Sequence, residues 1–231
     1  MKKQRAKSQA GFSLIELAVA MVIMLTLLGI VSSVMSRTLG IRSRESRKTD
    51  ALTSAQAALN VISREVGNTG FGIYDGDSTL LSSNGIILAD SDANKIRIRS
   101  NYLNTGPRTA PAGSTVVSTN QPGEDVTYFF DNATNSIVRY DPYGIETSPG
   151  VYGPQTSVVV NRISNVVFEY YNYEGANSTP TVTNVPTANT GRVRITVAVN
   201  MDPVVGQPDN QQVRFSTDVT LRNSNYMLRQ Y

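Results

Sequence analysis

The stretch GFSLIELAVAMVIMLTLLGIV (residues 11–31) decides the fold of this 231-residue chain. The apolar run continues almost unbroken from Phe12 to Met35, long enough to cross the hydrocarbon core of a bilayer, about 30 Å thick, as a helix. Glu16 departs from this pattern, because it places a carboxylate near the start of the run. A charged side chain in hydrocarbon costs about 2.5–3.5 kcal/mol on insertion scales, so Glu16 is a candidate functional residue that needs a partner.

Three kinds of N-terminal segment compete for residues 1–35. An ordinary secretory signal has an apolar core of about 7–15 residues, which this run exceeds. A plain membrane anchor fits the length, and the four basic residues before Gly11 place residues 1–11 in the cytoplasm by the positive-inside rule. The plain anchor leaves Glu16 unexplained. A leader that is cut on the cytoplasmic side of the apolar run accounts for both the length and the carboxylate.

The residues KSQAGFSLIELAVAMVIM (7–24) resemble the class III leader of type IV pilins and type II secretion pseudopilins. The resemblance implies that prepilin peptidase, a membrane aspartyl protease, cuts after Gly11 and methylates the new amino terminus at Phe12. Glycine suits a cleavage position because it has no side chain to obstruct the protease. The resemblance also implies that Glu16, the fifth residue from Phe12, pairs with the charged amino terminus of a neighbouring subunit and sets the axial register of a filament. The alternative is that Glu16 extends its carboxylate to the membrane interface.

The composition removes most familiar enzyme mechanisms. The chain is 40% hydrophobic and 17% charged, as in folded proteins, and it has no His and no Cys. Disulfides, thiolate metal sites and His-based acid/base catalysis are therefore excluded. Four of the 21 basic residues precede Gly11, which leaves 17 against 18 acidic residues and gives no support for a general affinity for nucleic acid. We expect no enzyme activity, no cofactor and no metal site.

The helix is expected to continue beyond the membrane, because no proline occurs before Pro107. A helix from Phe12 to about Val66 would be roughly 80 Å long. Its second half carries an apolar stripe that predicts packing against a folded head: Leu52, Ala55, Leu59, Ile62 and Val66. Its first half has small residues that let helices of different subunits approach closely: Ala18, Ala20, Gly29, Ser32 and Ser33. Between the halves, five basic residues form either a solvated helix face or a contact with lipid headgroups or another subunit: Arg37, Arg42, Arg44, Arg47 and Lys48.

After Val66 the pattern changes to β-type segments. Glycines in GNTGFGIYDGD (67–77) end the helix. Alternating or apolar segments predict strands at 85–90, 95–103, 125–130, 136–141, 192–201 and 212–223, and two strands within 157–175 that are separated by a polar break at 161–165. Segments 104–124 and 174–191 are rich in Ser, Thr, Asn, Gly and Pro and predict surface loops. The fold class expected is α+β, with a long N-terminal helix packed on a mostly antiparallel sheet.

The segments ISREVGNTGFGIYDG, TYFFDNATNSIVRYD, NRISNVVFEYYNYEG and DVTLRN resemble PilW-type minor pilins and the J-type minor pseudopilins of type II secretion. The resemblance implies a cleaved leader (1–11), a long helix (12–67) with a transmembrane segment (12–35), and a β-rich head (68–231). The expected partners are prepilin peptidase, other minor pilins, the major pilin, the inner-membrane assembly platform and, before assembly, membrane lipid. The chain is expected to cross the inner membrane once and then enter a pilus or pseudopilus near its tip.

Asp90, Asp92 and Asn94 could begin a calcium loop, but position six holds Lys95 and position twelve holds Asn101, so the EF-hand pattern fails and a turn is the expected structure. The alternative function is an adhesin or DNA-uptake subunit of the same filament. An aromatic and basic patch for DNA would use residues that alternate between two faces of a hairpin, so core packing explains them first: Tyr128, Phe129, Phe130, Arg139 and Tyr140.

Overall fold

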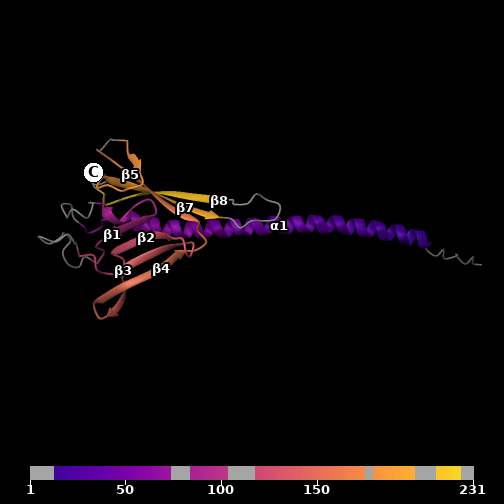
Figure 1. The fold of residues 1–231 in the computed structure, drawn as a ribbon, viewed down its shortest axis with the longest axis horizontal. Coiled ribbons are helices and arrows are strands. Elements are labelled where there is room, and N and C mark those ends of the chain that lie inside the picture. Colours follow the sequence, from indigo (N-terminus) through magenta and orange to yellow (C-terminus); the bar gives the residue numbers. More distant parts are fainter. Residues whose placement is uncertain (1–12, 74–83, 104–117, 175–178, 201–211, 225–231) are drawn as a thin grey trace, which may run out of the picture.

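The computed structural model describes residues 13–73, 84–103, 118–174, 179–200 and 212–224. Within them, α1 (Leu14–Gly67) is one helix of 54 residues, roughly 80 Å long. Its C-terminal part enters a head built from two antiparallel sheets, and its N-terminal part extends away from the head (Figure 1). The expected α+β architecture, a long helix packed on antiparallel sheet, is confirmed. The helix ends where the predicted glycine-rich segment begins.

The two sheets have four strands each, and every pairing between neighbouring strands is antiparallel. The first sheet has the order β1-β2-β3-β4 and the second the order β6-β5-β7-β8. The elements of the head are η1 (Leu88–Asp90), β1 (Lys95–Arg99), β2 (Asp125–Asp131), β3 (Ser136–Ser148), β4 (Val151–Val160), β5 (Asn165–Asn172), β6 (Thr181–Thr183), β7 (Thr190–Asn200) and β8 (Gln212–Thr220).

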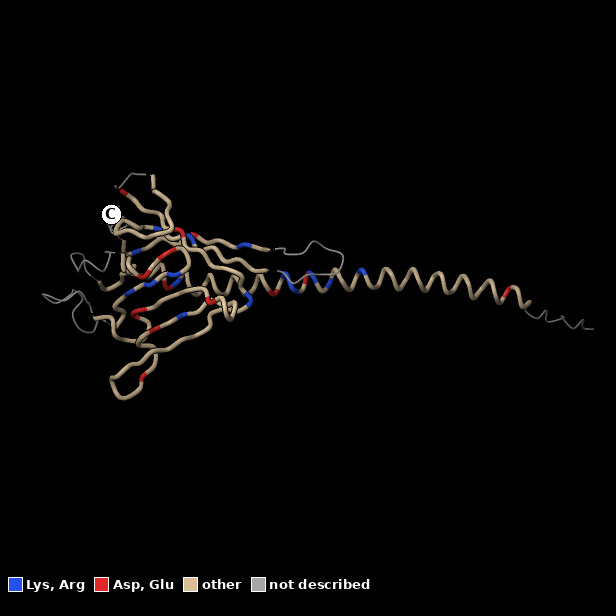
Figure 2. Tube along the Cα trace, in the orientation of Figure 1, with Lys and Arg blue, Asp and Glu red and all other residues tan. Residues whose placement is uncertain are grey.

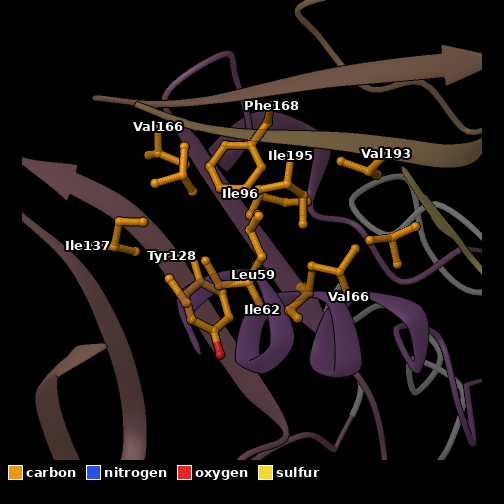
Figure 3. Packing of buried hydrophobic residues seen from close by; sticks show 14 of the residues in the cluster. Leu59, Ile62, Val66, Ile96, Tyr128, Ile137, Val166, Phe168, Val193 and Ile195 are labelled. Carbon is orange, nitrogen blue, oxygen red and sulfur yellow. The ribbon is translucent and has the colours of Figure 1, made fainter. Parts of the chain in front are cut away.

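The C-terminal part of α1 lies between the two sheets and supplies one side of a single core (Figures 1 and 3). Ala55, Leu59, Ile62 and Val66 are buried as the stripe predicts, whereas Leu52 is only half-buried. The sheets meet this stripe with alternate residues of their strands, among them Ile96, Tyr128, Phe168 and Ile195. Burial of these side chains is what fixes the helix to the head.

Most of the predicted strands are present, and their alternation sets the inner face of each sheet. In β1, Ile96 and Ile98 are buried while Arg97 and Arg99 lie on the outer face. The predicted hairpin is the β2–β3 pair, in which Tyr128 lies opposite Arg139. The polar break at 161–165 separates β4 from β5, as expected.

The prediction of a strand at 85–90 is wrong. Ile86 makes only an isolated bridge to Ile98, and Leu88–Asp90 form a short 3₁₀ helix. The backbone cannot continue as a strand because Gly85 has a positive φ of 77° and the Ser91 hydroxyl accepts the Arg97 amide at 3.0 Å. The Ser91 hydroxyl thus accepts a hydrogen bond that a backbone carbonyl of a neighbouring strand would accept in a regular sheet.

Two further elements were not predicted. The β3–β4 pair extends far beyond the predicted segments and turns at Gly150, which has a φ of 74°. Pro142, Gly144, Gly153 and Pro154 lie within this ribbon, and the register shifts at bulges that accommodate them. The predicted loop 174–191 also contains the short edge strand β6. Of the predicted loop 104–124, residues 104–117 lie outside the described residues.

Candidate functional site

The first turn of α1 holds Glu16 in a capping box with Ser13. The Glu16 amide donates to the Ser13 hydroxyl at 3.3 Å, and the Ser13 amide donates to Glu16 Oε2 at 3.0 Å. This arrangement satisfies two of the backbone amides that a helix leaves unpaired at its N-terminus, and the helix dipole favours a carboxylate there. Gly11 and Phe12, the predicted cleavage and methylation residues, lie outside the described residues.

The half of α1 that follows Glu16 is bare. Every residue from Leu14 to Leu39 is exposed within the chain, and Ile30, for example, retains 62% of its accessible surface. Figure 2 shows an uncharged stretch between an acidic position near the end of α1 and a basic cluster near the head. By length and composition, α1 is the one helix among the described residues that could cross a membrane. The described sheets provide no cover for this surface, and large exposed apolar surfaces mark sites that contact a membrane or another protein.

Two glycines of α1, Gly29 in the bare half and Gly40 next to it, have no packing role among the described residues. A Cβ atom added at Gly29 or at Gly40 would meet no atom within 4 Å. Glycine costs roughly 1 kcal/mol relative to alanine inside a helix, so the fold of the single chain gives no reason to have it there. Small residues on a bare helix allow another helix to approach closely, which is an intersubunit role.

The second half of α1 is joined to the first sheet by a polar network that the sequence did not reveal. Glu65 Oε2 accepts the Tyr128 hydroxyl at 2.7 Å and Arg139 Nε at 3.2 Å. Burial first, and then the Glu65 carboxylate, raise the pKa of Tyr128 well above its usual range, so its hydroxyl remains a donor. The signal in the sequence is one carboxylate, Glu65, three residues after Ile62 of the apolar stripe.

The carboxylates of the segment DSDANK (90–95) have structural roles. Asp92 Oδ1 accepts the amides of Asn94 and Lys95 and so forms a turn, while Asp90 pairs with Arg97. No group of three or more potential metal-ligating side chains, counting His, Cys, Asp and Glu, occurs among the described residues. Asp75 and Asp77, for which the sequence YDGDS predicts a glycine-containing turn rather than a metal site, lie outside the described residues.

The aromatic and basic residues of the β2–β3 hairpin do not gather on one surface. Tyr128 is buried in the core, and Arg139 beside it pairs with Glu65. Tyr140 lies on the opposite face of the sheet and is 37% exposed. A stacking platform for single-stranded DNA would need these residues together on one surface. In the structure they lie on two opposite faces of the sheet.

The N-terminal segment has a counterpart among known families. Residues 6–32 match the family model described as the prokaryotic N-terminal methylation motif. The match includes Gly11, Phe12 and Glu16 and supports a prepilin of the type IV pilin or pseudopilin class, which prepilin peptidase processes and which assembles with other pilins. Together with the bare helix, it is consistent with membrane anchoring and incorporation into a pilus. Searches of curated proteins and of solved structures returned no match to this chain.

Proposed function

We propose that this chain is a PilW-like minor pilin of a type IV pilus. The observation that carries the proposal is the combination of the methylation motif with a helix whose apolar half has no cover of its own and carries a carboxylate in its first turn. The minor, tip-proximal role is supported only by the resemblance of the head segments to PilW-type subunits. We also propose that the chain is a substrate of processing enzymes and not itself an enzyme.

In the proposed pathway, prepilin peptidase hydrolyses the peptide bond between Gly11 and Phe12 and methylates the new amine of Phe12. That amine is charged at neutral pH, because the reference pKa of an α-amino group is near 8. It then lies at the positive end of its own helix dipole, which is an unfavourable place for a cation. A carboxylate from the next subunit offsets that charge, and Glu16 is the acidic residue in the right part of the helix.

The capping box gives Glu16 a role in the single chain as well. Before assembly, its Oε2 accepts the Ser13 amide of its own helix, while Oε1 has no such partner among the described residues. A carboxylate can accept several hydrogen bonds, so Glu16 can keep its own cap and pair with a neighbour's amine through the second oxygen. The same residue then serves both the isolated subunit and the filament.

The experiment that tests this pathway is mass spectrometry of the N-terminus from cells with an active prepilin peptidase. We expect the first peptide to begin at N-methylated Phe12. Gly11→Val should leave residues 1–11 attached, because the side chain obstructs the protease. If the wild-type chain keeps its first eleven residues in such cells, the proposal fails.

Glu16 is tested separately from cleavage. Glu16→Gln should be cleaved normally but be incorporated into filaments at least about tenfold less, since loss of one charged contact in a low-dielectric site costs about 1.4 kcal/mol or more. Glu45→Gln is the matched control, because Glu45 is an exposed glutamate of the same helix outside the apolar run. Normal incorporation of Glu16→Gln would contradict the docking role.

The same motif and helix would serve a minor pseudopilin of a type II secretion system, which is the second candidate. Deletion of the gene, with surface fibres, twitching and exoprotein release scored separately, distinguishes the two. We expect loss or reduction of fibres and twitching with normal release. Loss of secretion with intact pili would assign the chain to the secretion system instead.

A further inference from the structure

Asn84 and Gly85 form the one Asn-Gly pair of the chain. Asparagine followed by glycine is the pair most prone to deamidation in proteins, because glycine has no side chain to hinder the attack of its backbone nitrogen on the asparagine side chain. Asn84 nevertheless lies in the interior of the head, where it has no exposed surface. The structure therefore holds a chemically reactive pair in a position that water does not reach.

The Asn84 side chain makes three hydrogen bonds, which use both ends of its amide. Nδ2 donates to the carbonyl of Thr190 at 2.7 Å and to the carbonyl of Thr187 at 3.3 Å. Oδ1 accepts the backbone amide of Ile86 at 3.1 Å. Because carbonyl oxygens only accept and a backbone N–H only donates, the orientation of the amide is determined, and a carboxylate could not make the same contacts.

These hydrogen bonds join the two sheets of the head. On one side, the segment that follows Asn84 pairs with β1 of the first sheet, since the Arg99 amide donates to the carbonyl of Gly85 at 2.8 Å. On the other side, Thr187 and Thr190 belong to the turn that leads into β7 of the second sheet. The amide of Asn84 is thus a polar link between the sheets, in addition to the apolar core.

Gly85 cannot be exchanged for a residue that would slow the reaction. Its φ is 77°, in the left-handed region that favours glycine. A Cβ atom at this position would lie 2.3 Å from the backbone nitrogen of Gly70 and 2.6 Å from the carbonyl oxygen of Arg99. The fold needs the donors of Asn84 and the missing side chain of Gly85, so it has a structural reason to keep a chemically unstable pair.

From this geometry we infer that Asn84 is a site of spontaneous deamidation that the closed head protects. In the open chain, the backbone nitrogen of Gly85 loses its proton to water and attacks Cγ of Asn84. The new bond between this nitrogen and Cγ closes a succinimide ring, the Cγ–Nδ2 bond breaks, and Nδ2 takes up a proton and departs as ammonia. Water then opens the ring and gives aspartate or isoaspartate in place of asparagine.

The folded head opposes this reaction in two ways. Three hydrogen bonds hold the Asn84 amide in one orientation, and burial excludes the water that accepts the proton and opens the ring. The reaction therefore requires opening of this part of the head, and its rate follows the population of the open state.

The product cannot restore the link between the sheets. An aspartate in place of Asn84 has no donor at neutral pH, and its charge would face the carbonyl oxygens of Thr187 and Thr190. Isoaspartate would also lengthen the backbone by a methylene group beside Gly85, which is already in close contact with Gly70. The pair thus limits how long the chain can stay unfolded and still close to full stability. This protection involves neither cleavage nor a filament, so a failure of the processing experiment would leave it intact.

The test compares the full chain folded in detergent with the same chain unfolded in guanidinium chloride, at the same pH and temperature. Peptide mapping by mass spectrometry follows deamidation at Asn84 and, as an internal reference, at Asn135, which is exposed and precedes Ser136. We expect Asn84 to react faster than Asn135 in the unfolded chain. Folding should lower the ratio of the two rates by at least about tenfold, because a buried, hydrogen-bonded segment is open for only a small fraction of the time. An equal ratio in the two states would overturn the inference.

The variant Asn84→Asp tests the consequence for the fold. It should melt at least about 5 °C lower than the wild type, because it loses the donors of a buried link and places a charge against carbonyl oxygens. Asn135→Asp is the matched control, with the same chemical change at an exposed position, and should melt as the wild type does.

A second measurement applies if Asn84→Asp does not fold. Wild-type chain aged in denaturant is refolded, and the fraction deamidated at Asn84 should melt lower than the unmodified fraction. A deamidated fraction with the stability of the wild type, or wild-type melting of Asn84→Asp, would show that the pair sets no limit on refolding and that the inference is wrong.

Discussion

The two halves of α1 have the same backbone geometry and opposite environments. From Leu14 to Leu39 every residue is exposed, whereas Ala55, Ala58, Ile62 and Val66 are fully buried against the sheets. Hydrophobicity alone does not distinguish the halves, since both carry leucine, isoleucine and valine. The difference is that the described residues supply a partner for one half only. Residues in the second half of α1 therefore contribute to the stability of the head. Residues in the first half contribute to association with a membrane or with other chains.

The two glutamates of these halves show the same contrast. Glu65 has partners from the head, Tyr128 and Arg139, and is only partly exposed. Among the residues that the structure describes, Glu16 has only Ser13 of its own first turn as a partner. A carboxylate beside a folded partner stabilises the single chain, whereas one on a bare helix has its second oxygen available for another chain.

The same substitution in each half gives the largest expected difference. Ile62→Ala should lower the free energy of unfolding of the head by about 2–5 kcal/mol, because it removes a fully buried side chain and leaves a cavity. Ile30→Ala, at a position 62% exposed, should leave that free energy unchanged. Chemical denaturation of the full chain in detergent measures both. Equal losses from the two variants would show that the halves are not independent in the way described.

Removal of one hydroxyl tests the link between the second half and the first sheet. Tyr128→Phe should cost roughly 1–2 kcal/mol, since Glu65 loses a buried donor but keeps Arg139. Tyr140→Phe, on the outer face of the same sheet, is the control and should cost little.

The pH dependence sharpens this prediction. The folded state raises the pKa of Tyr128, through burial and then through Glu65, so its contribution is complete below the unfolded pKa of about 10 and is lost as pH rises above that value. The stability of the wild type should therefore approach that of Tyr128→Phe in alkaline solution. A difference that stays constant above pH 10 would contradict this account of the network.

The smallest effect is expected on the outer face of the second sheet, away from α1. Asp218 accepts two hydrogen bonds from Arg194, at 2.7 and 3.0 Å, and these lower the pKa of its carboxyl. Asp218→Asn should lower the melting temperature by at most about 3 °C, because solvent screens exposed pairs. A lowered pKa contributes stability above about pH 4 that is lost as pH falls through the folded value, so variant and wild type should converge in acid. A gap that widens in acid would be inconsistent with this pair.

The helix and most strands could be predicted because their signals are local. The stripe of Ala55, Leu59, Ile62 and Val66 gives a helical period, and Ile96 and Ile98 give a period of two. In both cases the buried face follows from which positions are apolar. The leader motif is also local, and the family match supports its class from the same residues.

The features that were missed depend on contacts between distant residues. Residues 85–90 are apolar enough for a strand, but the Ser91 side chain takes the hydrogen bond that would have extended it. The bulges that admit Pro142 and Pro154 into the β3–β4 ribbon exist only in the paired structure. The partners of Glu65 lie 63 and 74 residues away in sequence. The local spacing of apolar residues gives no indication of such contacts.

The uninterrupted course of α1 also has a mechanical consequence. One rod joins the first turn at Glu16 to the core at Val66, with no proline hinge between them. A displacement of the head along the rod axis must carry the Glu16 carboxylate by nearly the same distance. Tension along an assembled fibre would likewise be transmitted to the contacts that Ile62 and Glu65 make with the sheets. These contacts in the core of the head would therefore resist separation of the head from α1.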